Sequence, residues 1–465
     1  MDYILPLIVL VPFMALIPLM LLGKKHSYLI AVCASIISFL LVAYAAYSFY
    51  SGQVVGTFSH AFLPEFGVNF SLQVTPYSML LLIMTSVVFV AASMVGKYFI
   101  GSRDRLYGTL FLIAEGSSLG VFLSANLAFL YIFWEITEVM VFFIIFIYGG
   151  YNRRYASIKF ILYSIVSSLL LLIGIMVLYS AIHTFNIDSI LASRSSISAA
   201  VQLAALILLS LSFLIKVPVF PFHTWLPDAH TEAPTTGSMV LAGVLLKFGG
   251  YGFLLIFLML PIAASFAPYF FLIFLFSAIY SGLVSVRQLN VKRLIAYTSI
   301  TDMGVVGVGL ATVSVFGYNG AVYAMLSHGM AISVLFLIAG TLDELYGTLE
   351  ISKIKGVVKS FPAIAYLFIG GVFAALGIPL TSGFIADLLI FISSSASFGA
   401  AGLLPLAGIF MIGMAMFWLI ERSFMNSSHE VLPYNSLDRS VVIAGVFLIA
   451  ATVVFGIVPS LFFGL

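Results

Sequence analysis

Long apolar stretches separated by short polar segments run along almost the whole chain of 465 residues. A helix that crosses a membrane needs roughly 20 mostly apolar residues. Fourteen stretches meet this requirement, at residues 3–23, 27–49, 77–100, 106–124, 126–149, 155–182, 199–222, 235–260, 263–286, 291–314, 318–341, 362–392, 400–424 and 439–463. The pattern therefore predicts an all-α polytopic membrane protein with short loops. The first stretch directly follows Met1-Asp2 without a basic segment, so we expect it to be the first span rather than a cleaved signal peptide.

Composition excludes the other broad classes. Hydrophobic residues make up 63% of the chain and charged residues only 8%, whereas soluble proteins carry roughly 25% charged residues. Transmembrane β-barrels show alternating segments of about 10 residues, and the apolar runs here are continuous. The single cysteine, Cys33, excludes an internal disulfide, a CxxC metal site and a cysteine-ligated iron–sulfur cluster within this chain.

Basic residues indicate the orientation of the spans, because cytoplasmic loops are enriched in lysine and arginine. The loops after odd-numbered spans hold Lys24, Lys25, Lys97, Arg103, Arg105, Arg153, Arg154, Lys159, Arg287, Lys292, Arg293, Lys353, Lys355, Lys359, Arg422 and Arg439. The even-numbered loops hold only Arg194, while Lys216 and Lys247 lie inside spans seven and eight. We therefore expect the odd loops to be cytoplasmic and both termini to lie on the outer side of the membrane.

The chain reads as a single membrane domain, 1–465, with a faint internal repeat. The segment 214–222 (LIKVPVFPF) in span seven resembles 376–384 (LGIPLTSGF) in span twelve. Each places a proline in mid-membrane, where it removes a backbone donor and breaks the helix. Five spans separate the two segments, an odd offset that is typical of inverted repeats with discontinuous helices at a transport pathway.

Ionisable residues within the spans are the candidate functional groups, because a charge at bilayer depth costs several kcal/mol. They are Glu115, Glu135, Glu138, Lys216, Lys247, Asp302, His328 and Asp387. Each alone also fits a structural role, such as a helix-packing ion pair or a lysine that caps the carbonyls of a broken helix. Together they predict a row of proton-exchanging sites across the membrane interior.

Other kinds of site are less well supported. The segment 223–232 (HTWLPDAHTE) clusters two histidines and two carboxylates, but it has no His-x-x-x-His spacing, and Pro227 and Pro234 predict a rigid turn there. The histidines, His328 aside, lie mostly in loops and not where haem ligands would face one another. The glycines of 304–309 lie in an apolar helix rather than between a strand and a helix, so they form no nucleotide-binding fingerprint.

Several long motifs resemble those of the proton-translocating antiporter-like subunits of the complex I superfamily. They are EGSSLGVFLS at 115–124, FWE at 133–135, KVPVFPFHTWLPDAHTEAPT at 216–235, LKFGGYG at 246–252, VKRLIAYTS at 291–299 and SHG at 327–329. The resemblance covers spans four to thirteen. It implies fourteen helices with two inverted five-helix repeats and broken helices seven and twelve, and it divides the chain into 1–105, 106–260, 263–424 and 439–463.

The resemblance also implies roles for individual residues. Glu135 is similar to the family's carboxylate that pairs with a lysine on helix seven, here Lys216. Lys247 resembles the central relay lysine, His328 the polar relay group of helix eleven and Asp387 the site from which the proton leaves. The acid at 387 resembles the M type of these subunits, which corresponds to chain 4 of the mitochondrial complex, whereas related sodium/proton antiporter subunits carry lysine there.

Three residues depart from the family pattern. Two of them, Asp302 and Glu138, are secondary relay candidates, and the third, Asp387, alters the exit site. Asp302 replaces the usual histidine, Glu138 adds a carboxylate one turn after Glu135, and Asp387 is shorter than the usual glutamate. Glu115 is a further secondary candidate. These departures leave the transported ion and the redox partner open, since hydrogenase and sulfur reductase complexes have similar subunits.

By this resemblance the chain is a non-redox subunit of a redox-driven translocase in an energy-coupling membrane, such as a prokaryotic cytoplasmic membrane. It would hold no cofactor or metal of its own, and iron–sulfur clusters would belong to partner subunits. Expected partners are other antiporter-like and small membrane subunits, a peripheral redox arm, membrane lipids and protons or sodium, but no nucleic acid. The alternatives are a redox-independent sodium/proton antiporter subunit and a scaffold that has lost transport.

Overall fold

The chain folds almost entirely into helices in the computed structural model, which describes residues 3–22, 26–53, 56–63, 65, 68–101, 104–426 and 438–459. Within that part of the chain, 14 helices are long and apolar enough to cross a membrane. This finding confirms the predicted all-α polytopic class and the number of spans. The inverted symmetry of two five-helix repeats stays a prediction.

The helices differ in length, and several spans are built from two consecutive segments. In chain order the α-helices are α1 (Ile4–Met14), α2 (Leu16–Leu21), α3 (Ser27–Tyr50), α4 (Pro76–Phe99), α5 (Arg105–Leu123), α6 (Leu127–Tyr148), α7 (Arg153–Ile182), α8 (Ile187–Ser193), α9 (Ala199–Lys216), α10 (Trp225–Glu232), α11 (Thr235–Val240), α12 (Leu246–Met259), α13 (Ala263–Ser285), α14 (Val291–Ala311), α15 (Val315–Tyr346), α16 (Val357–Ser360), α17 (Pro362–Ala375), α18 (Ser382–Phe398), α19 (Leu406–Leu419) and α20 (Arg439–Ile457). Short 3₁₀ segments are η3 (Arg194–Ser196) and η5 (Gly399–Leu403), and π-helical segments are η4 (Leu241–Leu245) and η6 (Ile420–Met425).

Polar residues in the short connections start many of the membrane helices. Thr75 accepts a hydrogen bond from the Ser78 backbone in a capping box, and Pro76 opens α4 where no backbone donor is needed. Asn126 and Asn290 cap α6 and α14 in the same way, by accepting from backbone amides of the first turn.

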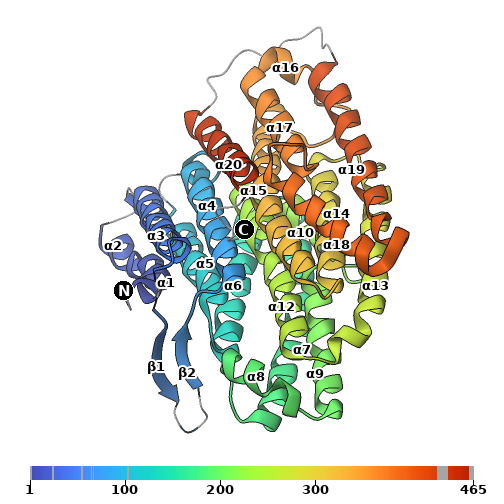
Figure 1. The fold of residues 1–465 in the computed structure, drawn as a ribbon. Helices are drawn as coiled ribbons and strands as arrows, with labels where there is room; N and C mark the ends of the chain where they lie inside the picture. Colours follow the sequence, from blue (N-terminus) through green and yellow to red (C-terminus); the bar gives the residue numbers. More distant parts are fainter. Residues whose placement is uncertain are drawn as a thin grey trace.

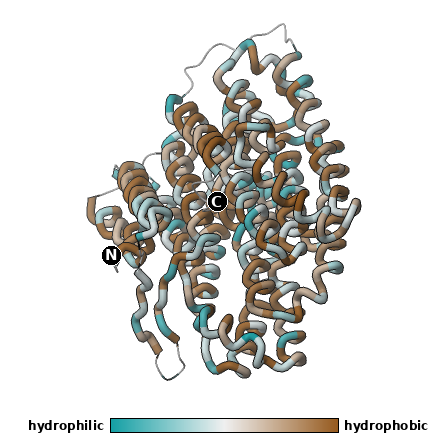
Figure 2. The backbone as a smooth tube through the Cα atoms, in the orientation of Figure 1, coloured by the Kyte–Doolittle hydropathy of each residue, from teal (hydrophilic) through white to brown (hydrophobic). Residues whose placement is uncertain are grey.

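The N-terminal helices α1 to α3 lie at one edge of the bundle, beside α4 and α5 (Figure 1). The last helix, α20, returns to pack on α4 and α15. An antiparallel hairpin of β1 (Phe58–Leu63) and β2 (Val68–Leu72) projects at the end of the bundle where α8 also lies (Figure 1). Apolar residues predominate along the helices (Figure 2).

The loops after odd-numbered spans meet at one end of the bundle. The Glu232 carboxylate accepts a hydrogen bond from the Asn152 backbone at 2.8 Å, which joins the loops after spans five and seven. Asn290 and Glu350 form a backbone bridge that joins the loops after spans nine and eleven. This arrangement is the one that the alternating distribution of basic residues predicts, and the assignment of this end to the cytoplasm stays a prediction. Three of the basic residues in that pattern lie outside the described residues: Lys24, Lys25 and Arg103.

The even-numbered loops meet at the opposite end. Leu72 and Ser124 form one backbone bridge between these loops, and Asn126 and Asn186 form another. The two ends are therefore each tied together by backbone pairs in addition to helix packing.

Two of the predicted spans, 199–222 and 362–392, are interrupted; these are the two in which the sequence predicts a break at a proline. In the seventh span, α9 ends at Lys216 because Pro218 and Pro221 supply no backbone donors. The stretch 362–392 divides into α17 and α18, and the connection 376–381 contains Gly377 and Leu380 with positive φ. A left-handed backbone conformation ends an α-helix, so this stretch does not continue as one rod.

The proline-rich segment after Lys216 also differs from expectation. The rigid turn predicted around Pro227 and Pro234 is wrong, since residues 225–232 form α10. Pro227 stands in the first turn of α10, where its missing amide has no helical acceptor to lose, so it does not prevent the helix.

Candidate functional site

Lys216, the last residue of α9, is buried and contacts α6 and α7. Its Nζ is 2.5 Å from Glu138 Oε1 of α6, and both side chains are almost fully buried. The same ammonium donates a hydrogen bond to Ser164 Oγ of α7 at 2.9 Å and lies 5.8 Å from the centroid of the Phe160 ring. Three side chains of neighbouring helices therefore contact the lysine at the end of α9.

Glu138 is fixed from its own helix as well. The indole Nε1 of Trp134, four residues earlier and therefore on the same face of α6, donates a hydrogen bond to Glu138 Oε1. Trp134 is itself buried. The carboxylate thus has one donor from its own helix and one cation from α9.

The pairing of Lys216 with Glu135, which the family resemblance implied, is not the one observed. Glu135 is only half-buried and lies on the side of α6 where Ile132 and Val139 are exposed. Residues three apart on a helix differ by about 60° in direction, and α6 is rotated so that Glu138 faces Lys216. Glu135 Oε1 has no hydrogen-bond partner within the described part of the chain.

Lys247 is completely buried in α12, just after the π-helical segment η4. Its Nζ donates a hydrogen bond to the Ala242 carbonyl at 2.5 Å and lies 2.7 Å from His328 Nδ1 of α15. The wider turn of a π-helix is often found at functional sites. Here it holds the backbone carbonyl that binds the lysine.

Close packing brings the helices of the two lysines together. A Cβ atom placed on Gly249 would come within 2.8 Å of the Val217 backbone nitrogen and 3.0 Å of Lys216 Cβ. Only glycine fits such an approach between backbones. The Gly249-Gly250 pair that follows Lys247 therefore allows α12 to touch the end of α9.

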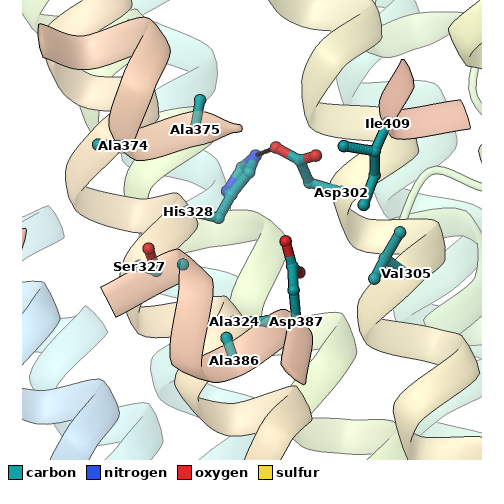
Figure 3. Close-up of a pocket in the computed structure, with 11 residues that line it drawn as sticks. Asp302, Val305, Ala324, Ser327, His328, Ala374, Ala375, Ala386, Asp387 and Ile409 are labelled. Carbon is teal, nitrogen blue, oxygen red and sulfur yellow. Dashed lines mark ion pairs between the residues drawn. The ribbon is translucent and has the colours of Figure 1, made fainter. Parts of the chain in front are cut away.

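Beyond Lys247, two aspartates and His328 surround one small cavity (Figure 3). His328 Nε2 is 3.8 Å from Asp302 Oδ2 of α14. Asp387 of α18 points its carboxylate into the same space (Figure 3). The cavity of about 30 Å³ also contacts Ser327 and has room for one or two water molecules.

Asp387 owes its position to the interruption between α17 and α18. Gly377 has a φ of +61°, and a Cβ at that position would lie 2.6 Å from Asp387 Oδ2. Glycine is therefore required both for the left-handed turn and for the space that the carboxylate occupies.

The structure joins six of the eight predicted residues into two groups and leaves Glu135 and Glu115 apart. Glu138 and Lys216 form the first group, and Lys247, His328, Asp302 and Asp387 form the second. Glu115 of α5 lies elsewhere: its Oε2 accepts a hydrogen bond from Ser35 Oγ of α3 at 2.7 Å.

The sequence motifs include Trp134 only as part of FWE at 133–135, without a role, and they do not include Ser164. The four-residue spacing of Trp134 and Glu138 was a usable signal for the indole–carboxylate hydrogen bond. Ser164 left no such signal, since a serine on a membrane helix is common and its partner is 52 residues away.

The histidines and carboxylates of 223–232 are engaged in separate contacts. Asp228 pairs with Lys159 at 2.8 Å and Arg293 at 3.0 Å, while His230 stacks on Phe336 with ring centroids 4.4 Å apart. No group of three or more metal-ligating side chains occurs among the described residues. These side chains hold α10 against its neighbours.

The chain is similar to known membrane-complex subunits. Residues 124–432 match the family model described as NADH:quinone oxidoreductase/Mrp antiporter, TM. NADH-quinone oxidoreductase subunit M of Rickettsia bellii is 35% identical over 94% of this chain and 89% of that protein.

Solved structures agree with this match. A chain of respiratory complex I from Thermus thermophilus superposes with a TM-score of 0.91 at 26% identity, covering 98% of this chain and 96% of that one. A chain of the Mrp complex from Dietzia sp. gives 0.88 at 17% identity over 99% and 95% of the two chains, which shows the same fold. The chain therefore belongs to the NADH:quinone oxidoreductase/Mrp antiporter family of transmembrane subunits.

Proposed function

We propose that this chain is a proton-translocating membrane-arm subunit of a redox-driven, complex I-like respiratory complex. The observation that carries the proposal is a series of buried contacts from Lys247 through His328 to Asp302. Lys247 lies on α12, which packs against the end of α9, where Lys216 pairs with Glu138. Burying six ionisable groups costs free energy that a purely structural core would avoid. Their mutual contacts supply the acid–base partners that proton transfer needs.

The proposed transfer follows from the chemistry of buried lysines. Burial favours the neutral amine, whereas a carboxylate in contact favours the ammonium. Closing or opening the Glu138–Lys216 contact therefore loads or releases a proton at Lys216. A transfer across 100 mV requires about 2.3 kcal/mol per charge, which a change of about two pKa units supplies, because one unit is worth about 1.4 kcal/mol.

Each residue then has a proposed role in the direction of transfer. Lys216 passes the proton to Lys247, whose Nζ touches His328 Nδ1, and the imidazole passes it to the cavity shared by Asp302 and Asp387. Asp387 is the exit site. Glu135, half-buried on α6, and Glu138 set the charge around Lys216.

The surroundings of the subunit are part of the proposal. The chain would form a single membrane domain, 1–465, and carry no redox centre, with iron–sulfur clusters in a peripheral arm of partner subunits. Other antiporter-like and small membrane subunits and lipids would surround it in a prokaryotic cytoplasmic membrane, with both termini on the outer side.

A second candidate is a redox-independent sodium/proton antiporter subunit. The feature that favours it is the pair of aspartates at one cavity with the Ser327 hydroxyl, because a sodium ion is bound by oxygen ligands. The acid at position 387, where the resemblance implies lysine for such antiporters, favours the redox-driven pump instead.

The test is to purify the assembly from native membranes in mild detergent, identify its subunits by mass spectrometry and reconstitute it into vesicles. Lys216→Ala should reduce donor-driven proton pumping at least about tenfold with assembly intact. The matched control, Lys353→Ala, removes an exposed lysine paired with Glu350 and should pump normally. Pumping by Lys216→Ala at the unaltered stoichiometry overturns the relay. Sodium-dependent proton exchange without any electron donor, and without redox subunits, supports the antiporter instead.

A further inference from the structure

Glu115 is a fully buried carboxyl group of α5. This helix packs against the N-terminal helices α1 and α3 (Figure 1). One of its oxygens accepts the hydrogen bond from Ser35, and Oε1 has no hydrogen-bond partner in the described structure. No lysine, arginine or histidine within the described residues forms an ion pair with it. Glu115 has no role in the proposed relay.

A seam of small and polar residues runs along the contact of α3 and α5 to Glu115. On α3, Tyr28, Ala31, Ser35 and Ser38 recur at helical spacing and share one face. On α5, Gly108, Glu115 and Ser118 share a face in the same way, together with the larger Phe111. The hydroxyls of three serines on these two helices are buried without a hydrogen-bond partner among the described residues: Ser27, Ser38 and Ser118.

The seam opens into a cavity at the end of the bundle that carries the α4–α5 loop. This cavity of about 20 Å³ is lined by Ser27, Tyr28, Ala31, Ser93 and Asp104, among others, and has room for a water molecule.

The floor of the cavity lies close to the carboxyl. Phe111, which lines the cavity, is four residues or about 6 Å along α5 from Glu115. On α3, Ala31 of the cavity wall is likewise four residues from Ser35, the partner of Glu115.

We propose that Glu115 is a separate proton-binding site that exchanges protons with the α4–α5 loop side through water and hydroxyls along the α3–α5 seam. Glu115 is 11 residues from Asp104, so it lies about 16 Å deep, near the middle of a hydrocarbon core about 30 Å thick. The inference rests on the proposed function only in taking the proton as the transported ion.

The chemistry of the site fits a proton rather than a metal cation. One carboxylate and one hydroxyl are far fewer than the six or more oxygens that calcium or magnesium requires. In the transfer step, the Ser35 hydroxyl passes its proton to the Glu115 carboxylate and takes one from a protonated water that enters the seam from the cavity, and that water is left neutral. Serine is unchanged, and the carboxylate becomes a carboxylic acid.

Infrared difference spectroscopy of the purified assembly tests the site, because a protonated carboxyl has its own C=O band. Glu115→Gln should remove one such band. In D₂O this band shifts as the carboxyl hydrogen exchanges, and Ala31→Leu, which fills the cavity, should slow that exchange at least about tenfold. The matched control is Ala43→Leu, the same change on the same helix at an exposed position that faces a different groove.

Either of two results would overturn the proposal: no carboxyl band lost in Glu115→Gln, or equal exchange rates in the two leucine variants. If Ala31→Leu does not assemble, Ser35→Ala replaces it, since it removes the hydroxyl step but leaves the carboxyl. Lys216→Ala should keep the Glu115 band and its exchange rate even where pumping is lost. A failure of the relay proposal is thereby distinguished from a failure of this one.

Discussion

Lys216 and Glu138 are so close that removing one of the two charges should change the free energy of unfolding measurably. At the observed 2.5 Å between Nζ and Oε1, two unit charges attract by about 6 to 7 kcal/mol at an effective dielectric constant of about 20. Ser164 and the Phe160 ring remain to stabilise the ammonium after the carboxylate is lost. We therefore expect Glu138→Gln to lower the free energy of unfolding by about 3–5 kcal/mol, as for other buried pairs that lose one partner.

The Glu138→Gln variant removes the negative charge while keeping the size of the side chain. Its amide oxygen can still accept the hydrogen bond from Trp134 Nε1, and its volume is unchanged, so no cavity is made. A drop in stability then reports the loss of the charge opposite Lys216 rather than a packing defect.

The assay is reversible unfolding in mixed detergent micelles, applied to a double-mutant cycle. Glu138→Gln, Lys216→Met and the double variant should give a coupling energy of about 2–3 kcal/mol. The matched control, Glu135→Gln, should couple to Lys216→Met by less than about 0.5 kcal/mol. A larger coupling for Glu135 than for Glu138 would refute the observed pairing as the resting arrangement.

Two further predictions concern the second lysine. His328→Leu removes the ring nitrogen that lies 2.7 Å from Lys247 Nζ, so donor-driven pumping should fall about 100-fold in vesicles; an unchanged rate would exclude the imidazole from the relay. Gly249→Ala places a methyl group 2.8 Å from the Val217 backbone nitrogen, and the unfolding free energy should fall by about 1–3 kcal/mol. Its control, Gly96→Ala, meets its nearest neighbour at 4.0 Å and should be within about 0.5 kcal/mol of the parent.

The buried lysines could be recognised from the chain alone, but their partners could not. A charge within an apolar stretch is visible as soon as the stretch is recognised, so Lys216 and Lys247 were identified. Glu135 and Glu138 differ only in direction around one helix, and nothing in their spacing fixes the rotation of α6. The resemblance favoured Glu135, whereas packing turned Glu138 toward the lysine.

The partner of Asp302 could not be predicted from the sequence either. Its place next to His328 depends on how α14 and α15 lie against one another, so it was only a secondary candidate. The pair at 3.8 Å and the shared cavity bring it next to the residues that were ranked first.

By itself the sequence determined the membrane class, the number of spans and the alternation of loops between the two ends. These properties depend on hydrophobicity summed along the chain, which is a local quantity. It also indicated the helix break at Pro218, since a missing donor acts on its own helix.

Only the tertiary structure decided which ionisable groups meet. It separated Glu115 from the row of Lys216 and Lys247 and gave that residue a partner on α3. It also made a helix of 225–232, where two prolines predicted a turn. The physical reason is that contacts between helices depend on their rotation, depth and distance of approach, and these are set by packing among residues far apart in the chain.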